Sequence, residues 1–112
     1  MKRYVTLVAM LAMAFGMVGA AVAADPAEIP LVIEKNRFQP DVITVKAGAP
    51  FVLVITNKDK GPEEFELAQP RIEKIIPGGK TVRLKMPALK PGKYPVVGEY
   101  HAETAKATIV AE

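Results

Sequence analysis

The residues best suited to chemistry lie in two acidic stretches, and one of them holds the only histidine of the chain. The stretch GEYHAET (residues 98–104) places His101 between Glu99 and Glu103. The stretch EEFE (residues 63–66) follows a strongly apolar segment. An imidazole with carboxylates suits iron or Cu(II). These stretches raise the hypothesis of a metal site, although a lone histidine is more often a surface or hydrogen-bonded residue.

Signatures of an enzyme are sparse. The chain contains no cysteine and no serine, which excludes a thiol nucleophile and a serine triad. No glycine-rich phosphate loop precedes a helical segment, and a domain of this size offers little room for a sugar cleft. The sequence therefore favours a non-enzymatic binding protein.

Strand alternation decides which of the acidic side chains could act together. If a strand begins at Glu64, then Glu64 and Glu66 share one face and Phe65 takes the opposite face, toward the core. Glu99 and His101 share a face if the preceding strand continues through them. Glu63 is interpreted as a solvated loop residue.

The elements that must position these residues read as short strands separated by Pro, Gly, Asn and Asp about every ten residues. This spacing predicts an all-β Greek-key sandwich of about eight strands. The expected strands are 31–35, 42–46, 51–56, 64–67, 71–76, 81–85, 92–99 and 105–111. Residues 51–55 are apolar throughout, which predicts a central strand buried on both faces. Residues 25–30 are expected to be a lead-in, and residues 36–41 a loop.

The first 24 residues have the pattern of a secretory signal peptide. Lys2 and Arg3 precede a long uncharged stretch that ends in small residues before Asp25. Cleavage after Ala23 or one residue later would leave one domain, residues 25–112, without stable membrane insertion. An uncleaved anchor is the alternative. Without Lys2 and Arg3, the remaining basic residues nearly balance the 12 acidic ones, so no nucleic-acid footprint is seen.

From about residue 30 to residue 112 the sequence resembles a cupredoxin. The resemblance rests on ordered short motifs: FQP (38–40), VITVKAG (42–48), VLVITNKD (52–59), EFEL (64–67), IPGGK (76–80) and KPGKY (90–94), followed by Gly98 and His101. It implies a histidine ligand where Glu64 stands, a cysteine near Gly98 and an axial methionine near Lys106. Only His101 is kept, so a blue-copper centre, which is defined by its thiolate, is excluded.

The glutamate and the GEYHxxTA ending resemble a narrower group, the small periplasmic cupredoxin-like proteins associated with bacterial iron uptake. That resemblance implies a periplasmic protein that binds copper or iron beside a ferrous-iron permease and its periplasmic iron-binding protein, and assists Fe(II) oxidation or electron transfer. It implies Glu64 and His101 as the first metal ligands, brought together by the fold, then Glu99 and Glu103, then Glu66.

Two other functions are compatible with the same residues. One is a metal-free sandwich that serves as a structural or protein-binding accessory, and the other is a periplasmic copper-delivery protein. A dedicated metal site predicts that Glu64 and His101 converge. A purely structural role predicts that they point apart or pair with Lys or Arg.

Overall fold

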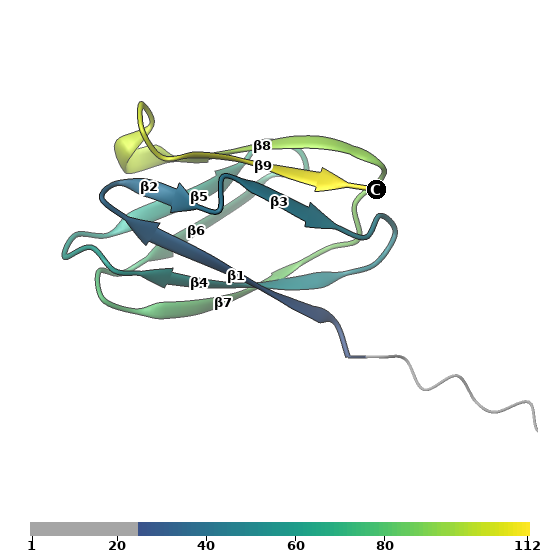
Figure 1. The fold of residues 1–112 in the computed structure, drawn as a ribbon, viewed down its shortest axis with the longest axis horizontal. Helices are drawn as coiled ribbons and strands as arrows, with labels where there is room; N and C mark the ends of the chain where they lie inside the picture. Colours follow the sequence, from purple (N-terminus) through teal and green to yellow (C-terminus); the bar gives the residue numbers. More distant parts are fainter. Residues whose placement is uncertain (1–24) are drawn as a thin grey trace, which may run out of the picture.

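The computed structural model describes residues 25–112, which form two β-sheets packed face to face (Figure 1). The strands are β1 (Ala27–Glu34), β2 (Arg37–Gln39), β3 (Val42–Val45), β4 (Phe51–Asn57), β5 (Glu63–Leu67), β6 (Ile72–Ile76), β7 (Thr81–Met86), β8 (Gly92–Gly98) and β9 (Lys106–Ala111). One short 3-10 helix, η1 (Glu99–His101), lies between β8 and β9. The expected all-β sandwich is confirmed.

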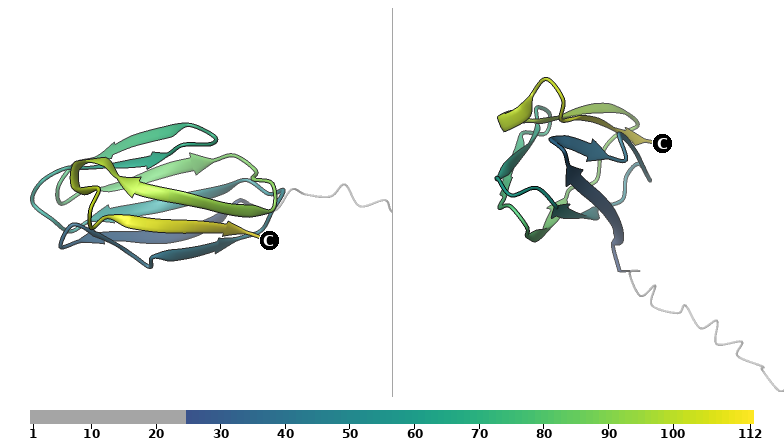
Figure 2. Two further views of the ribbon diagram at one scale, coloured as in Figure 1. Left: turned by 90° about the horizontal axis from the view of Figure 1, so that it is seen from above. Right: turned by 60° about the vertical axis from the view of Figure 1, so that its left-hand side comes forward.

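The sheets are mixed, and the chain crosses between them repeatedly. One sheet has the order β2-β1-β4-β7 and the other β3-β9-β8-β5-β6. The β1–β4 and β3–β9 pairs are parallel, whereas the remaining pairs are antiparallel. Figure 2 shows β1 and β9 in opposite layers. Loops that join different strands are thereby gathered at each end of the sandwich.

The core follows from alternation along each strand. In β7, Met86 is buried with Leu84 and Val82 on its side, while Arg83 and Lys85 are exposed. Phe38 and Phe65 meet edge to face across the two sheets, with ring centroids 6.3 Å apart. The other fully buried apolar residues are Leu31, Ile33, Ile43, Leu53, Ile55, Leu67, Ile76, Val96, Ala105 and Ile109.

The described residues contain nine strands rather than about eight. The additional strand, β2, lies in the segment that the sequence predicted as a loop, and it pairs with the end of β1. β1 also begins earlier than expected, because residues 27–30 pair with β4. Pro30 is tolerated there because β2 pairs only with Val32, Ile33 and Glu34, which leaves one side of β1 open at Pro30.

The expectation that β4 is buried on both faces is only partly correct. Phe51, Leu53 and Ile55 point into the core, but on the opposite face Val54 is half-buried. Val52 on that face is 7% exposed. Within residues 25–112 no further layer covers this sheet, so the outer face of β4 is shielded only by neighbouring side chains.

The proposed signal peptide, residues 1–24, lies outside the described residues. Among residues 25–112 no helix is long and apolar enough to cross a membrane.

Gly98, the last residue of β8, is tightly packed where β8 leads into η1. A Cβ atom at this position would lie 2.5 Å from the Cβ of Ala105 and 2.8 Å from the carboxyl carbon of Glu63. Ala105 is fully buried and Glu63 is 1% exposed, so neither has free space to move into. Glycine is required here by space, since its backbone is ordinary extended chain with φ −83°.

We expect Gly98→Ala to lower the free energy of unfolding by about 1–3 kcal/mol, the usual cost of overpacking a core. Urea denaturation measures this change. Gly61→Ala is the matched control, because a Cβ at Gly61 meets no atom within 4 Å. Equal stability of the two variants would contradict the packing that we describe.

Candidate metal centre

The single histidine lies on η1, at the end of the sandwich where β8 leaves its sheet. The strand ends at Gly98, whose N–H donates to the carbonyl of Ala105 at 2.8 Å. The carbonyl of His101 then accepts hydrogen bonds from the N–H groups of Thr104 and Ala105, at 3.1 and 2.8 Å. This closed loop holds the imidazole half-exposed at the surface. Because β8 does not continue, the expected strand alternation of Glu99 and His101 is wrong.

The partner of His101 is Glu63, the first residue of β5. Its Oε2 lies 2.6 Å from the His101 Nδ1. Its Oε1 accepts backbone hydrogen bonds from Glu64 and Tyr100, each at 3.0 Å. Glu63 is 1% exposed, so the interpretation as a solvated loop residue is wrong. A buried carboxylate is stable only when such partners replace water.

The structure places Glu63, which was not among the predicted ligands, in contact with His101. Glu63 shares the inward face of β5 with Phe65 and Leu67, whereas Glu64 and Glu66 lie on the outer face. The hydrogen bond of His101 is therefore with Glu63, on the face of β5 opposite to that of Glu64. The signal was available, because Glu63 is two residues before the core residue Phe65 and strand side chains repeat with a period of two.

Glu64 and Glu66 belong instead to an acidic cluster on the outer face of the five-stranded sheet. Carboxylate oxygens of Glu64, Glu66 and Glu73 all lie within 4.8 Å of one another. The register explains this, because Glu66 faces Glu73 on the neighbouring strand β6. Glu73 also forms an ion pair with Arg71 at 2.8 Å. Glu73 was not singled out in the sequence.

The electrostatics of this cluster connect it to η1. A hydrogen bond with the Glu99 carboxyl, together with desolvation and repulsion from Glu99 and Glu73, raises the pKa of Glu66 above its ordinary value. Desolvation, followed by the charge of Glu64 and a hydrogen bond to it, raises the pKa of Tyr100. The outer carboxylates of β5 and η1 therefore repel each other and attract protons, as they would attract a cation.

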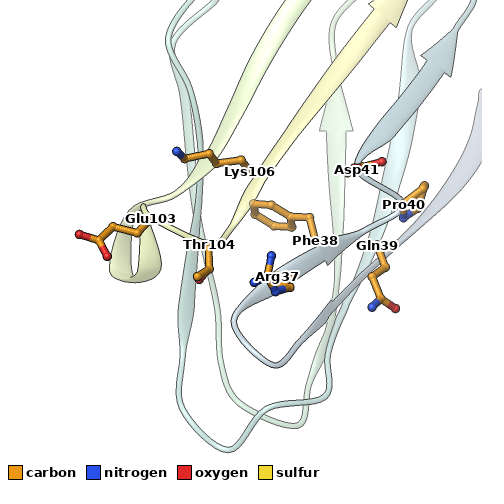
Figure 3. A pocket seen from close by; sticks show the side chains of 8 residues that line it. All are labelled: Arg37, Phe38, Gln39, Pro40, Asp41, Glu103, Thr104 and Lys106. Carbon is orange, nitrogen blue, oxygen red and sulfur yellow. The ribbon is translucent and has the colours of Figure 1, made fainter.

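Glu103 lies on the other side of the loop. It lines a surface pocket of about 500 Å³ together with Arg37, Phe38, Thr104 and Lys106. Figure 3 shows the Glu103 carboxylate pointing away from the Phe38 ring. The hydroxyl of Thr104 donates to the carbonyl of Asn36 at 2.6 Å, which ties the loop to the β1–β2 turn. Glu103 and Glu64 thus line different surface pockets.

Two residues that the sequence did not single out fix the loop before β5. The fully buried Asn57 donates to the carbonyls of Gly61 and Ile76, at 2.9 and 3.0 Å. Asp59 accepts the N–H groups of Lys35 and Asn36, at 2.8 and 2.9 Å. Lys35 and Asn36 both have positive φ angles, as the tight β1–β2 turn requires. Asn and Asp in a loop were a signal for such backbone bonding.

The residues present do not fit a thiolate copper centre. The chain has no cysteine. Gly98, the position implied for a cysteine, has no room even for a Cβ while Glu63 is in place. Met86, the only methionine of the described residues, is 2% exposed in the core. What the end of the sandwich does offer is one imidazole and several carboxylates, a set suited to harder ions.

Comparisons with known proteins agree with the fold. The cupredoxin-like domain family matches residues 7–111. A protein of Rickettsia prowazekii (strain Madrid E), described as uncharacterized, is 32% identical over 83 residues, which is 74% of this chain and 66% of that protein. The chain therefore spans about two thirds of the length of this curated relative.

Solved structures with the same fold include auracyanin A and an amicyanin. Auracyanin A, a "blue" copper protein from Chloroflexus aurantiacus, superposes with a TM-score of 0.68 at 17% identity, covering 79% of this chain and all of that one. Amicyanin from Paracoccus versutus gives a TM-score of 0.61 at 17% identity, covering 83% and 87%. The sandwich, the strand pairing and the family match lead to one conclusion: the chain belongs to the cupredoxin-like domain family.

Proposed function

We propose that this protein binds a copper or iron ion through imidazole and carboxylate ligands, and that it works in the periplasm in support of iron uptake. The observation that carries the proposal is the contact of Glu63 with His101. The only histidine of the chain is held by a buried carboxylate, next to a strand whose outer face carries the clustered Glu64 and Glu66.

The chemistry of the side chains favours oxidised, harder ions. Carboxylate oxygens and an imidazole suit Cu(II) and iron, whereas Cu(I) prefers the thiolate and thioether ligands that this end of the sandwich does not offer. The candidate ligands are His101, Glu64, Glu66 and Glu99, with Glu103 on the far side of the loop. A bound Cu(II) would supply a one-electron acceptor for ferrous iron, which is the link to Fe(II) oxidation or electron transfer.

The role in iron uptake rests on the sequence resemblance to periplasmic cupredoxin-like proteins of ferrous-iron permease systems. The proposed partners are such a permease and its periplasmic iron-binding protein. Auracyanin A and amicyanin have the same fold, and the description of auracyanin A as a "blue" copper protein supports metal handling by this architecture. Each is less than 20% identical in sequence to this chain, so the likeness supports a shared fold alone. The choice of ion therefore depends on the ligands of this chain.

We expect the purified protein to bind Cu(II), and anaerobically Fe(II), at one saturable site in isothermal titration calorimetry. His101→Ala should weaken binding by at least about 100-fold, since losing a direct ligand should cost no less than losing a supporting residue. Glu64→Gln tests whether the outer carboxylates contribute to the same site. Glu28→Gln is the control for lost charge, because Glu28 is exposed and pairs with Arg83. Binding that is indifferent to His101→Ala would refute the proposed centre.

The alternative function, a metal-free accessory domain, is favoured by one observation. Both oxygens of Glu63 already have hydrogen-bond partners within the protein, so the Glu63–His101 pair is stable without an ion. The same titration decides between the two functions, because an accessory domain would show no saturable binding of Cu(II) or Fe(II).

We expect the protein isolated from the periplasmic fraction to begin at Ala24 or Asp25. The basic start, the long uncharged stretch and the small residues before Asp25 favour cleavage there. Intact-mass measurement and amino-terminal sequencing check this prediction. A full-length chain recovered only with membranes would instead support an uncleaved anchor.

We expect Glu66→Gln to stabilise the metal-free protein slightly at pH 7. Glu66 has a raised pKa in the folded state, so its favourable contribution is present at pH values below its unfolded pKa and is lost as pH rises through its folded pKa. Glutamine stays neutral and removes the repulsion from Glu99 and Glu73. Urea denaturation at pH 7 and pH 4 should show the gain at pH 7 and little difference at pH 4. A loss of stability at pH 7 would contradict the repulsion that we infer.

A further inference from the structure

We propose that four lysines at one end of the sandwich form a docking surface for a partner protein whose own surface is acidic. The lysine surface consists of Lys35, Lys58, Lys60 and Lys80, all of which are exposed. Figure 1 shows the β1–β2 turn, the β4–β5 loop and the β6–β7 turn, which carry these residues, at the end opposite the carboxyl terminus. The inference depends on charge and needs no metal ion. Only a role in passing an ion to or from His101 rests on the proposed function.

Asp59 holds these three loops together as one unit. Its carboxylate accepts the N–H groups of Lys35 and Asn36 in the β1–β2 turn, at 2.8 and 2.9 Å. Its carbonyl accepts the N–H of Gly79 in the β6–β7 turn, at 3.0 Å. One residue of the β4–β5 loop therefore fixes the other two loops relative to it.

The backbone of the other three lysines is fixed as well. The N–H of Lys58 donates to a carbonyl of β1 at 2.8 Å, and the carbonyl of Lys80 accepts the N–H of Asn57 at 2.9 Å. The carbonyl of Lys60 packs so closely against Gly78 that a Cβ there would lie 2.0 Å from the Lys60 oxygen. The four side chains therefore extend from fixed points of the backbone.

The positive charge of the lysine surface is not neutralised within the described part of the chain. None of the ion pairs among residues 25–112 includes one of these four lysines. Asp59 is the only acidic residue in the three loops, and backbone N–H groups occupy both of its carboxylate oxygens. The ammonium groups therefore repel one another, and an anionic partner would relieve this repulsion.

The residue types of the three loops indicate the class of partner. The exposed large apolar residues of the described chain, Val42, Ile75 and Tyr100, all lie outside these loops. A surface that binds a membrane inserts such side chains into the lipid, so lipid is disfavoured. The cations are all lysines, which are hydrated point charges, whereas the planar arginine fork is the group that recognises phosphate bidentately. An acidic protein surface therefore fits these loops better than lipid or nucleic acid.

The lysine surface borders residues of opposite charge, which sets the orientation of the partner. β5, which follows the β4–β5 loop, carries Glu64, and η1 carries Glu99. This end of the sandwich therefore has a basic side and an acidic side, and a complementary partner matches both in only one orientation. Because the loops lack an apolar centre, the complex should be transient and sensitive to salt.

Titration of the purified, ¹⁵N-labelled, metal-free protein with a decaglutamate peptide tests the proposal through amide chemical shifts. We expect saturable shifts confined to residues 35–36, 58–62 and 77–80. They should vanish when NaCl is raised from about 20 mM to about 1 M, where the Debye length is only about 3 Å. An absence of shifts at low salt, or shifts spread evenly over all lysines, would overturn the proposal. This measurement uses the natural sequence and does not depend on a variant.

A pair of matched variants tests the location of the surface. The first replaces the lysine surface and carries Lys35→Gln, Lys58→Gln, Lys60→Gln and Lys80→Gln. The second removes the same charge from other exposed positions and carries Lys46→Gln, Lys85→Gln, Lys90→Gln and Lys93→Gln. Exposed ion pairs are weak singly and act here as a set, so the first variant should lose affinity for the peptide by at least about 10-fold and the second by less than about 2-fold. Equal losses in the two variants would refute the assignment.

Two further readouts separate docking from other roles. The variant of the lysine surface should be no less stable to urea than the natural protein, because backbone hydrogen bonds hold the loops. A loss of stability would show that the lysines are structural and would overturn the proposal, as would tighter binding to phosphatidylglycerol vesicles or single-stranded DNA than to the peptide. If the peptide binds and Cu(II) does not, the proposed function fails while the docking surface stands.

Discussion

The buried carboxylate of Glu63 is the constraint on which this end of the molecule depends. It joins the start of β5 to η1 through two hydrogen bonds, one from the Tyr100 N–H and one with the His101 imidazole, and it also accepts the N–H of Glu64 within β5. An isolated buried carboxylate would cost several kcal/mol, so all three partners must stay in place. These contacts hold η1 against the start of β5, directly after β8 ends at Gly98.

The neighbouring loops are fixed by polar groups of the same kind. Asn57 holds the segment before β5, and Asp59 ties that segment to the β1–β2 turn. Thr104 ties the loop after η1 to that turn as well. Figure 1 shows these connections gathered at one end of the sandwich, opposite the carboxyl terminus. The candidate centre is therefore positioned by hydrogen bonds of the protein and does not require an ion for its shape.

Most strands were predictable from the sequence because alternation and turn residues are local signals. β7 and β9 could be placed in this way to within a residue or two. β2 could not, since three residues carry too little alternation and the strand exists only because β1 offers a partner. Within the site, Glu64 was chosen over Glu63 on the resemblance. The period of two from Phe65 would have placed Glu63 inward, but its partner His101 is 38 residues away and is supplied only by the fold.

The alternation of β5 also separates two kinds of acidic chemistry on one strand. Glu63 points inward, where one carboxylate oxygen accepts the N–H of Tyr100 and the other forms a hydrogen bond with the His101 imidazole. Glu64 and Glu66 point outward, where Glu73 and Glu99 add like charge and the pKa of Glu66 is raised. Repulsion of this kind lowers stability unless a proton or a cation relieves it. One strand thus carries an inward carboxylate that holds the single histidine and an outer face that positive charge would stabilise. Because the chain has no thiolate, the available carboxylates and imidazole favour harder ions.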